Sequence, residues 1–336
     1  MRILAIESSC DDTSAAVVDD GRVVLSCVVS SQDAFHAKYG GVVPELASRR
    51  HLEMIGPVVD EALQRADTSL NEIDAVAATN GPGLIGSLLV GLNFAKSLAF
   101  ARGLPFAAVN HIEGHLFAAR LGDKAPAPPF VGLVVSGGHT DLYRVEVDYR
   151  PRLLGRTRDD AAGECFDKVA KMLGLGFPGG VVIDKLSRDG DPNGVELPRP
   201  MLHSGDDAFS FSGLKTAVKT HVETHGEPEG KALNDLAASL SAAIVDVLCA
   251  KLFAAAERER VSQVVVCGGV AANSMLRARV TQEAERRGME LFIPAITFCT
   301  DNAAMIGAAG QALLDRQGPS PLSVNAFASL VKGIAP

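Results

Sequence analysis

The sequence contains no tryptophan and only 3 tyrosines among its 336 residues. Proteins that stack bare nucleic-acid bases on aromatic side chains depend on such residues, so no aromatic platform for bases is expected. Basic residues do not compensate, because 32 Lys and Arg stand against 40 Asp and Glu and the formal net charge is −8. Any contact with RNA therefore requires a local patch or a partner protein.

Cysteine pairs are also missing. The 6 cysteines are scattered along the chain without any C-x-x-C spacing, which favours reduced thiols over a disulfide framework or a zinc knuckle. Acidic residues at Glu7, Asp11 and Asp12 interrupt the N-terminal segment before a signal-peptide core could form. No uncharged apolar run is long enough to span a membrane. These absences predict a soluble cytoplasmic protein that does not contact a membrane.

Two segments share a strand–turn–strand pattern. In the first, residues 3–7, 14–18 and 23–29 are expected strands; in the second, residues 131–135 and 141–147 flank the turn Ser136-Gly137-Gly138-His139-Thr140. Apolar-periodic stretches predict helices over residues 44–66, 86–102, 112–121, 163–173, 214–225 and 231–260. Two such hairpins, one opening each half, predict a duplicated α/β architecture with a cleft between the halves.

Glycine pairs at the ends of apolar runs mark candidate ligand loops. Gly137-Gly138 closes the second hairpin, and Gly268-Gly269 links an expected strand at 264–267 to a helix. A turn that leads into a helix points backbone N–H groups at its contents, which suits phosphate or ribose. An ordinary strand–helix loop that happens to carry glycine is the alternative.

His111 and His115 are the most unusual feature of the run AVNHIEGHLFAARL, residues 108–121. This run is expected to be helical, and residues four apart project on the same side of a helix. With 8 histidines in the chain, such a pair arises by accident with a chance of roughly one in five. Metal binding is the other interpretation, because histidine is the commonest metal ligand, and it requires a third ligand.

Asp301, in FCTDNAAMIG, is the candidate for that third ligand. An Asp that opens a helix is usually its N-cap, and from this segment alone capping is the favoured interpretation. Two histidines and one carboxylate would suit Fe²⁺ or Zn²⁺. Asp11, at the first hairpin turn, could contact the ion or its water. The HIEGH order is not the H-E-x-x-H of zinc peptidases, since Glu113 lies about 200° around the helix from the first histidine.

Ten ordered segments, among them ESSCDDTSAAVV, NHIEGHLFA, LVVSGGHTDL, CGGVAANSMLR and FCTDNAAMIG, cover residues 2 to about 315. Together they resemble the universal threonylcarbamoyladenosine tRNA-modification family, earlier labelled O-sialoglycoprotein endopeptidases. Asp12 departs from the family pattern, in which many members carry Glu, and Asn110 departs from relatives that have a further His there. Residues beyond about 315 carry no recognisable motif.

The resemblance implies a two-lobed α/β fold like that of actin, Hsp70 and sugar kinases, with duplicated mixed-sheet domains and a central cleft. The implied boundaries are residues 1–128 plus 297–336 for one lobe and 129–296 for the other. The implied reaction is transfer of the threonylcarbamoyl group from threonylcarbamoyl-adenylate to N6 of the adenosine 3′ of the anticodon. The substrates are tRNAs that read codons beginning with A, and AMP is released.

By position in the motifs, the resemblance implies a metal site and an adenylate site. The metal ligands are His111, His115 and Asp301, with iron ahead of zinc as the ion. The expected substrate-binding residues are Val134, Val135, Ser136, Gly137, Gly138, Asp167, Gly180, Asp184 and Asn273. Without the resemblance, a salt bridge to Lys171 is the alternative for Asp167. No general base is evident, and Asp11 is the candidate.

The resemblance also implies two helper proteins: an inactive paralogue that forms a heterodimer with this chain, and a small ATPase. The apolar segment GLNFAKSLAF, residues 91–100, is a candidate interface, although it could equally be core. Three other classes remain open: an actin-like ATP phosphotransferase, which gives the histidine pair no function; a metallopeptidase, disfavoured by the position of Glu113; and a non-enzymatic scaffold.

Overall fold

The computed structural model describes residues 1–39 and 41–329. The chain divides into two compact units, the first made of Met1–Ala125 with the segment from Thr300 onward and the second of Pro126–Cys299. The C-terminal part of the chain thus returns to the first unit, and this return delivers Asp301 to the same unit as the histidine pair.

The first unit is built on a mixed five-stranded sheet with the order β3-β2-β1-β4-β5. The antiparallel part follows the first predicted hairpin: β1 (Arg2–Glu7), β2 (Thr13–Asp19) and β3 (Val23–Ser30). Strands β4 (Ala75–Gly81) and β5 (Phe106–Asn110) then add in parallel to β1. The three expected strands of the first hairpin are confirmed.

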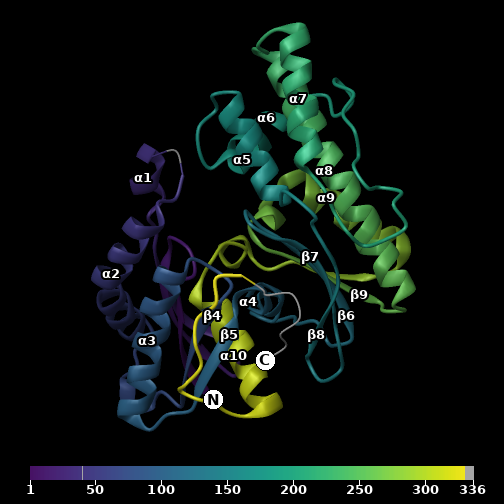
Figure 1. Ribbon diagram of the computed structural model, residues 1–336. Coiled ribbons are helices and arrows are strands. Elements are labelled where there is room, and N and C mark those ends of the chain that lie inside the picture. The colour runs from purple at the N-terminus through teal and green to yellow at the C-terminus, as the bar shows by residue number, and fades with distance from the viewer. Residues whose placement is uncertain (40, 330–336) are drawn as a thin grey trace. The chain divides into compact units, whose positions relative to one another are not determined.

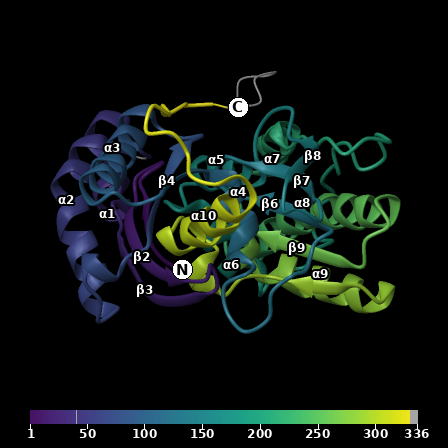
Figure 2. The ribbon, with the colours of Figure 1, turned by 90° about the horizontal axis from the view of Figure 1, so that it is seen from below.

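Alternate residues of this sheet pack against different helices. Leu4 and Ile6 of β1 join the core beneath α2 (Pro44–Arg65) and α3 (Ile85–Arg102). Ala5, on the opposite side of the same strand, lies against Gly307 of α10 (Ala303–Gln317). The sheet is therefore covered on both faces, with α2 and α3 on one side and α10 on the other (Figure 1 and Figure 2). Three short elements complete this unit: α1 (Asp33–His36), η1 (Ala37–Tyr39) and η2 (Leu70–Glu72).

The second unit repeats this topology with the strand order β10-β9-β6-β7-β8. Its antiparallel strands are β6 (Phe130–Val135), β7 (Thr140–Val145) and β8 (Pro151–Arg156), and β9 (Gln263–Cys267) and β10 (Glu290–Phe292) add in parallel. In both sheets the first strand is central, the next two extend one side and the last two extend the other. The predicted duplication of an α/β unit is confirmed.

Helix α8 (Lys231–Arg258) is the main core helix of the second unit and packs against β6 and β9. It is the one helix in the described part of the chain that is long and apolar enough to cross a membrane, but 83% of its apolar window is buried inside the protein. Its apolar character is thus accounted for by the core. The other helices of the second unit are α5 (Ala162–Met172), α6 (Gly179–Ser187), α7 (Ser212–His225), η3 (Gly269–Ala272), α9 (Ser274–Arg287) and η4 (Ile296–Phe298), of which α6 and α9 pack against α8.

The segment after α10, which carried no motif, is bonded to the first unit as far as it is described. The Ser320 amide donates to the carbonyl of Phe106 (2.8 Å), and the Ser320 hydroxyl accepts from the amide of Ala108 (3.1 Å). Both partners belong to β5, the edge strand, so the segment covers backbone groups that an edge otherwise exposes.

Candidate metal centre and adenylate loop

One residue, Asn110, ends strand β5 and caps helix α4 (His111–Ala118). Its side-chain oxygen accepts from the amides of Ile112 (2.9 Å) and Glu113 (3.3 Å), two of the donors that the first turn of a helix leaves unpaired. The helix therefore begins at His111, one residue before the predicted 112–121, whereas residues 108–110 of the run 108–121 belong to the strand. His111 and His115 occupy successive turns of α4, with ring centroids 4.8 Å apart.

Both histidines are buried, and one of them lacks hydrogen-bond partners. His111 is 6% exposed and His115 is 0% exposed. Within the described residues, neither ring nitrogen of His115 makes a hydrogen bond. A buried polar atom without a hydrogen-bond partner lowers the stability of the folded chain by about 1–3 kcal/mol. Coordination of a cation by the His115 imidazole would offset this cost.

Asp301 faces both rings. Its Oδ1 lies 3.5 Å from Nε2 of His111 and 3.3 Å from Nε2 of His115. The favoured capping interpretation of Asp301 is wrong: α10 is capped by Asn302, whose side-chain oxygen accepts from the Met305 amide at 3.0 Å. Because the neighbouring residue takes the cap, the carboxylate of Asp301 is turned toward the histidines.

Together the three side chains form a group that could hold a metal ion, with one ligand atom from each within 4.8 Å of the others. The donor types fit a divalent transition metal, because imidazole and carboxylate suit iron and zinc. The structural observation that supports this fit is the buried His115, whose ring nitrogens make no hydrogen bond within the described residues although Asp301 lies 3.3 Å from Nε2. All three residues belong to the first unit.

The other nitrogen of His111 faces residues that follow β1. Its Nδ1 lies 3.0 Å from Oε2 of Glu7 and 3.1 Å from the Ser9 hydroxyl. Burial lowers the pKa of His111, but the negative charges of Asp301 and Glu7 outweigh it and raise the pKa to about 9. The two carboxylates thus favour a positive charge at this position, which a bound cation could supply in place of a proton.

Asp11 and Asp12 follow β1 in the same unit. Burial, and then the charges of Asp11 and Asp301, raise the pKa of the Cys10 thiol, which indicates that both carboxylates are near it. Burial raises the pKa of Asp12 to about 7, and its Oδ1 makes no hydrogen bond within the described residues. The shorter side chain at this position is thus held in an environment that disfavours its charge.

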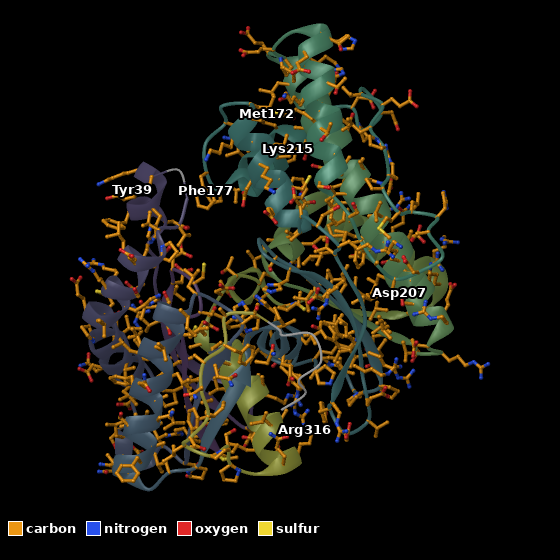
Figure 3. All side chains as sticks on the ribbon, in the orientation of Figure 1. Tyr39, Met172, Phe177, Asp207, Lys215 and Arg316 are labelled. Carbon is orange, nitrogen blue, oxygen red and sulfur yellow. The ribbon has the colours of Figure 1, made fainter. Side chains whose placement is uncertain are left out.

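Glu113, the acidic residue of HIEGH, is not a partner of the histidines. Burial raises its pKa, and the charge that opposes this shift is Arg316, near the end of α10 (Figure 3). This placement agrees with the expectation that Glu113 points away from both rings. It does not occupy the position of a peptidase general base.

In the second unit, the loop after β6 is held by two close backbone approaches. A Cβ at Gly163, in α5, would lie 2.5 Å from the Ser136 carbonyl, and one at Gly268 (φ +92°) would lie 2.4 Å from the Val135 carbonyl. At Gly137 and Gly138 themselves, a Cβ would meet nothing described within 4 Å. The contacts at Gly163 and Gly268 thus fix the position of the loop, whereas the space beside Gly137 and Gly138 is open. A site that binds a ligand through backbone N–H groups requires both features.

The predicted polar residues of the second unit hold helix ends. Asp167 Oδ1 accepts from the amides of Gly179 (2.8 Å) and Gly180 (3.3 Å), the first two of α6, and within the described residues it forms no ion pair with Lys171. Burial raises the pKa of Asp167, against these two N–H donors. Asp184 accepts from the amide and hydroxyl of Ser274 (2.7 and 2.8 Å), and Asn273 caps α9.

Two contributors were missed by sequence reasoning. Glu7 is fully buried beside His111, and Asn302 releases Asp301 from capping. A glutamate at the end of an otherwise apolar strand is the signal that could have identified Glu7, since an unpaired carboxylate is seldom buried.

Comparison with known proteins gives a match to the family model described as tRNA N6-adenosine threonylcarbamoyltransferase over residues 23–308. The relative from Geobacter metallireducens is 56% identical over 328 residues, 97% of this chain and 96% of that protein. The relative from Anaeromyxobacter dehalogenans strain 2CP-C is 58% identical over 322 residues, 95% and 96% of the two chains. Both bear the name of the family. The chain belongs to this family.

The family membership confirms the predicted class, an enzyme that modifies tRNA by transfer of a group to N6 of adenosine. It supports neither the phosphotransferase nor the peptidase alternative. The structure of component A of (R)-2-hydroxyglutaryl-CoA dehydratase from Acidaminococcus fermentans shares the fold, with a TM-score of 0.55, 15% identity and coverage of 94% of this chain and 98% of that one. The predicted actin-like fold class is confirmed.

Proposed function

We propose that this chain transfers the threonylcarbamoyl group from threonylcarbamoyl-adenylate to N6 of the adenosine 3′ of the anticodon, in tRNAs that read codons beginning with A. The observation that carries the proposal is the group formed by the buried His111 and His115 with the partly exposed Asp301, in a chain of this family. The N6 amine attacks the carbonyl of a mixed anhydride, the C–O bond to phosphate breaks, and AMP leaves. The amine loses a proton in this step.

The first unit supplies the metal ligands. His111, His115 and Asp301 would hold one divalent ion, with Fe²⁺ preferred and Zn²⁺ as the alternative. A bound ion would act as a Lewis acid on the threonylcarbamoyl group. Asp11, near the same cluster, is the residue proposed to accept the proton from the amine. The cytoplasm is the proposed location, and the free thiols of all six cysteines agree with a reducing compartment.

The second unit supplies the proposed adenylate site. The open backbone of Val134–Gly138 would bind the phosphate or the charge that develops on the carbonyl, and one such N–H donor contributes about 3 kcal/mol at the transition state. Asp167, Gly180, Asp184 and Asn273 would contact the nucleoside. A carboxylate has about four acceptor positions, so Asp167 and Asp184 could cap their helices and still accept from a ribose hydroxyl.

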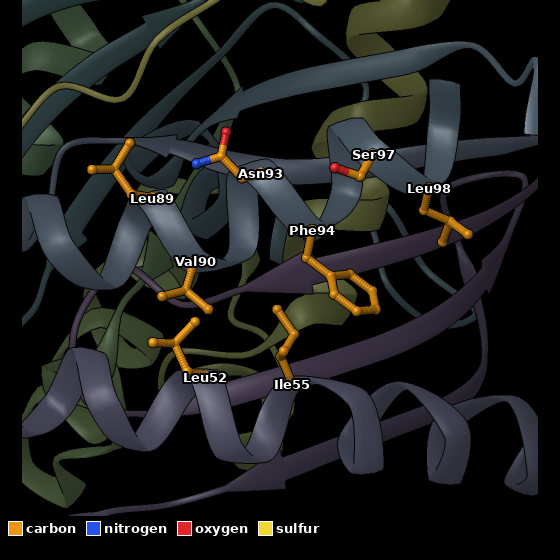
Figure 4. Close-up of a pocket in the computed structure, with 8 residues that line it drawn as sticks. All are labelled: Leu52, Ile55, Leu89, Val90, Asn93, Phe94, Ser97 and Leu98. Carbon is orange, nitrogen blue, oxygen red and sulfur yellow. The ribbon is translucent and has the colours of Figure 1, made fainter. Parts of the chain in front are cut away.

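A surface of the first unit is suited to the proposed paralogue. Between α2 and α3 lies a groove of about 610 Å³ lined by Leu52, Ile55, Leu89, Val90, Asn93, Phe94, Ser97 and Leu98 (Figure 4). Leu52 is 67% exposed and Leu89 is 42% exposed. The candidate interface at residues 91–100 thus contributes to an open apolar groove, the kind of surface that marks an interaction site. We place the heterodimer contact here, and the small ATPase would act on the resulting complex.

The contact would be tested by size-exclusion chromatography with the paralogue. Leu52→Asp should abolish the heterodimer because it places a charge in the groove. Val147→Asp is the matched control, since Val147 is 72% exposed, lies in a turn of the second unit and belongs neither to the groove nor to residues 91–100. Equal loss of the complex in both variants would exclude the groove as the specific site.

The reaction would be tested with threonylcarbamoyl-adenylate, tRNA and both helper proteins, with the modified nucleoside measured by mass spectrometry. Asp301→Ala should lose both bound metal and transfer. Glu113→Gln, which keeps the shape of that side chain, should retain both if the chain is a transferase. If Glu113→Gln removes activity and Asp301→Ala retains it, the proposed role of the cluster is wrong.

A further inference from the structure

Glu7 is the most deeply buried carboxylate beside the candidate metal centre. It is the last residue of β1, its exposure is 0%, and it is not among the proposed metal ligands. Three donors converge on it. The Ser9 amide donates to Oε1 at 2.5 Å, whereas the Thr79 hydroxyl donates to Oε2 at 2.7 Å and Nδ1 of His111 lies 3.0 Å from Oε2.

In this environment both carboxylate oxygens of Glu7 must accept hydrogen bonds. The Ser9 amide can only donate, and an ionised carboxylate can only accept. Oε2 therefore accepts the Nδ1–H of His111 when that nitrogen carries the proton. The opposite nitrogen of the ring, Nε2, then presents its lone pair on the side where Asp301 lies 3.5 Å away. The hydrogen bond that one ring nitrogen makes sets the state of the other.

We propose that Glu7 is a positioning residue, which fixes His111 as the tautomer with its proton on Nδ1 and so commits Nε2 to the metal. This inference rests on the metal site in the proposed function. Glu7 itself would not touch the ion. A carboxylate that orients a metal-bound histidine commonly contributes 10–100-fold to metal affinity.

Glutamine at this position has nearly the same shape but a different donor pattern. The single side-chain oxygen of the glutamine must face the Ser9 amide, because a backbone N–H group can only donate a hydrogen bond. Its NH₂ group then occupies the place of Oε2, next to His111. The Thr79 hydroxyl can rotate and accept from this group, but an Nδ1–H of His111 would then face an N–H donor and would keep only the Ser9 hydroxyl, 3.1 Å away, as an acceptor. Loss of the carboxylate therefore favours the tautomer with the proton on Nε2, which weakens the ligand nitrogen.

The test compares Glu7→Gln with Thr79→Val by competition for Zn²⁺ against a chromophoric chelator. Glu7→Gln should weaken zinc binding about 10–100-fold. Thr79→Val removes a hydrogen bond from the same carboxylate oxygen but leaves Glu7 facing His111, so its affinity should stay near that of the unchanged chain. Equal affinity in all three proteins, or equal losses in both variants, would overturn the proposal.

A second measurement does not depend on any variant. In the zinc-loaded unchanged chain, ¹⁵N NMR of the histidine side chains should show a proton on Nδ1 of His111 and metal on Nε2. Metal on Nδ1 would overturn the proposal. If the unchanged chain binds no zinc or iron at all, the metal centre of the proposed function fails, and this outcome is distinct from intact binding without the Glu7 effect.

Discussion

Gly163 determines how closely helix α5 approaches the loop after β6. Its amide donates to the Ser136 carbonyl at 3.2 Å, and a Cβ at this position would stand 2.5 Å from that carbonyl oxygen and 2.8 Å from the Gly137 Cα. Both neighbours are backbone, which cannot swing aside as a flexible side chain could. The position of the proposed adenylate loop therefore depends on the absence of one methyl group.

Gly163→Ala should lower the free energy of unfolding by about 1–3 kcal/mol, the usual cost of overpacking, as measured by urea denaturation. Gly138→Ala is the matched control in the same loop region, because its Cβ would meet open space. A surface substitution of that kind usually changes stability by no more than about 0.5 kcal/mol. Similar losses in both variants would contradict the argument from close approach.

Helix α10 places Asp301 by packing closely against the sheet of the first unit. A Cβ at Gly307 would lie 2.8 Å from the Val18 side chain, and one at Gly310 would lie 2.7 Å from the Ala77 Cβ. Two glycines, one turn apart on the same face, allow the helix to approach β1, β2, β4 and β5. Its N-terminal residues are thus brought to the helix that carries both histidines.

Gly310→Ala should destabilise the chain although alanine is the better helix former. The added methyl group must displace the Ala77 side chain or the helix, at a cost of about 1–3 kcal/mol. In α7, where a Cβ at Gly213 would meet nothing within 4 Å, Gly213→Ala should instead stabilise the helix by up to about 1 kcal/mol. Thermal unfolding of both variants checks the opposite signs, and a stabilised Gly310→Ala would refute the packing argument.

The start of helix α7 (Ser212–His225) depends on Asp159. Burial alone would raise the pKa of this carboxyl, but donors from Ser210, Phe211 and Ser212 outweigh it and lower the pKa below the ordinary 3.8. A lowered folded-state pKa means that the stabilisation is present above the unfolded-state pKa and is lost as pH falls through the folded-state value.

Asp159→Asn should therefore reduce stability most at neutral pH, by about 1 kcal/mol, the typical value of a helix cap. The difference from the unchanged chain should shrink as the pH falls below about 3.8, because the aspartate then loses its charge as well. Urea unfolding at a series of pH values measures this gap. A gap that is independent of pH would show that the charge of Asp159 does not matter.

At the scale of the whole molecule, local patterns predicted the duplicated sheets and the ligand candidates. The hairpins were readable because apolar strands alternate with polar turns at residues 3–29 and 131–147. The run 108–121 was predicted to be helical, but its first three residues, 108–110, form the end of the edge strand β5. Its strand conformation depends on pairing with β4, which no local pattern encodes.

Two other features depend on tertiary contacts. Asp301 and Asn302 are both good caps, and only the packed helix decides that Asn302 takes that position. The partners of Glu7, in particular Thr79 and His111, lie 72 and 104 residues further along the chain. The sequence identifies the residue types at the candidate site, whereas the orientation of each side chain comes from neighbours that are distant in sequence.

Because His111, His115 and Asp301 all belong to the first unit, removal of the metal should destabilise the two units unequally. A ligand present at 100 times its dissociation constant stabilises the state that binds it by about 2.7 kcal/mol. Chelation should therefore raise amide hydrogen exchange in α4, β1 and α10, whereas exchange in α8 and β9 of the second unit should change much less. In Asp301→Ala the chelator should have no effect on either set. If chelation instead deprotects α8 and β9 as strongly as α4, the two units unfold as a single cooperative block and the metal stabilises the whole molecule.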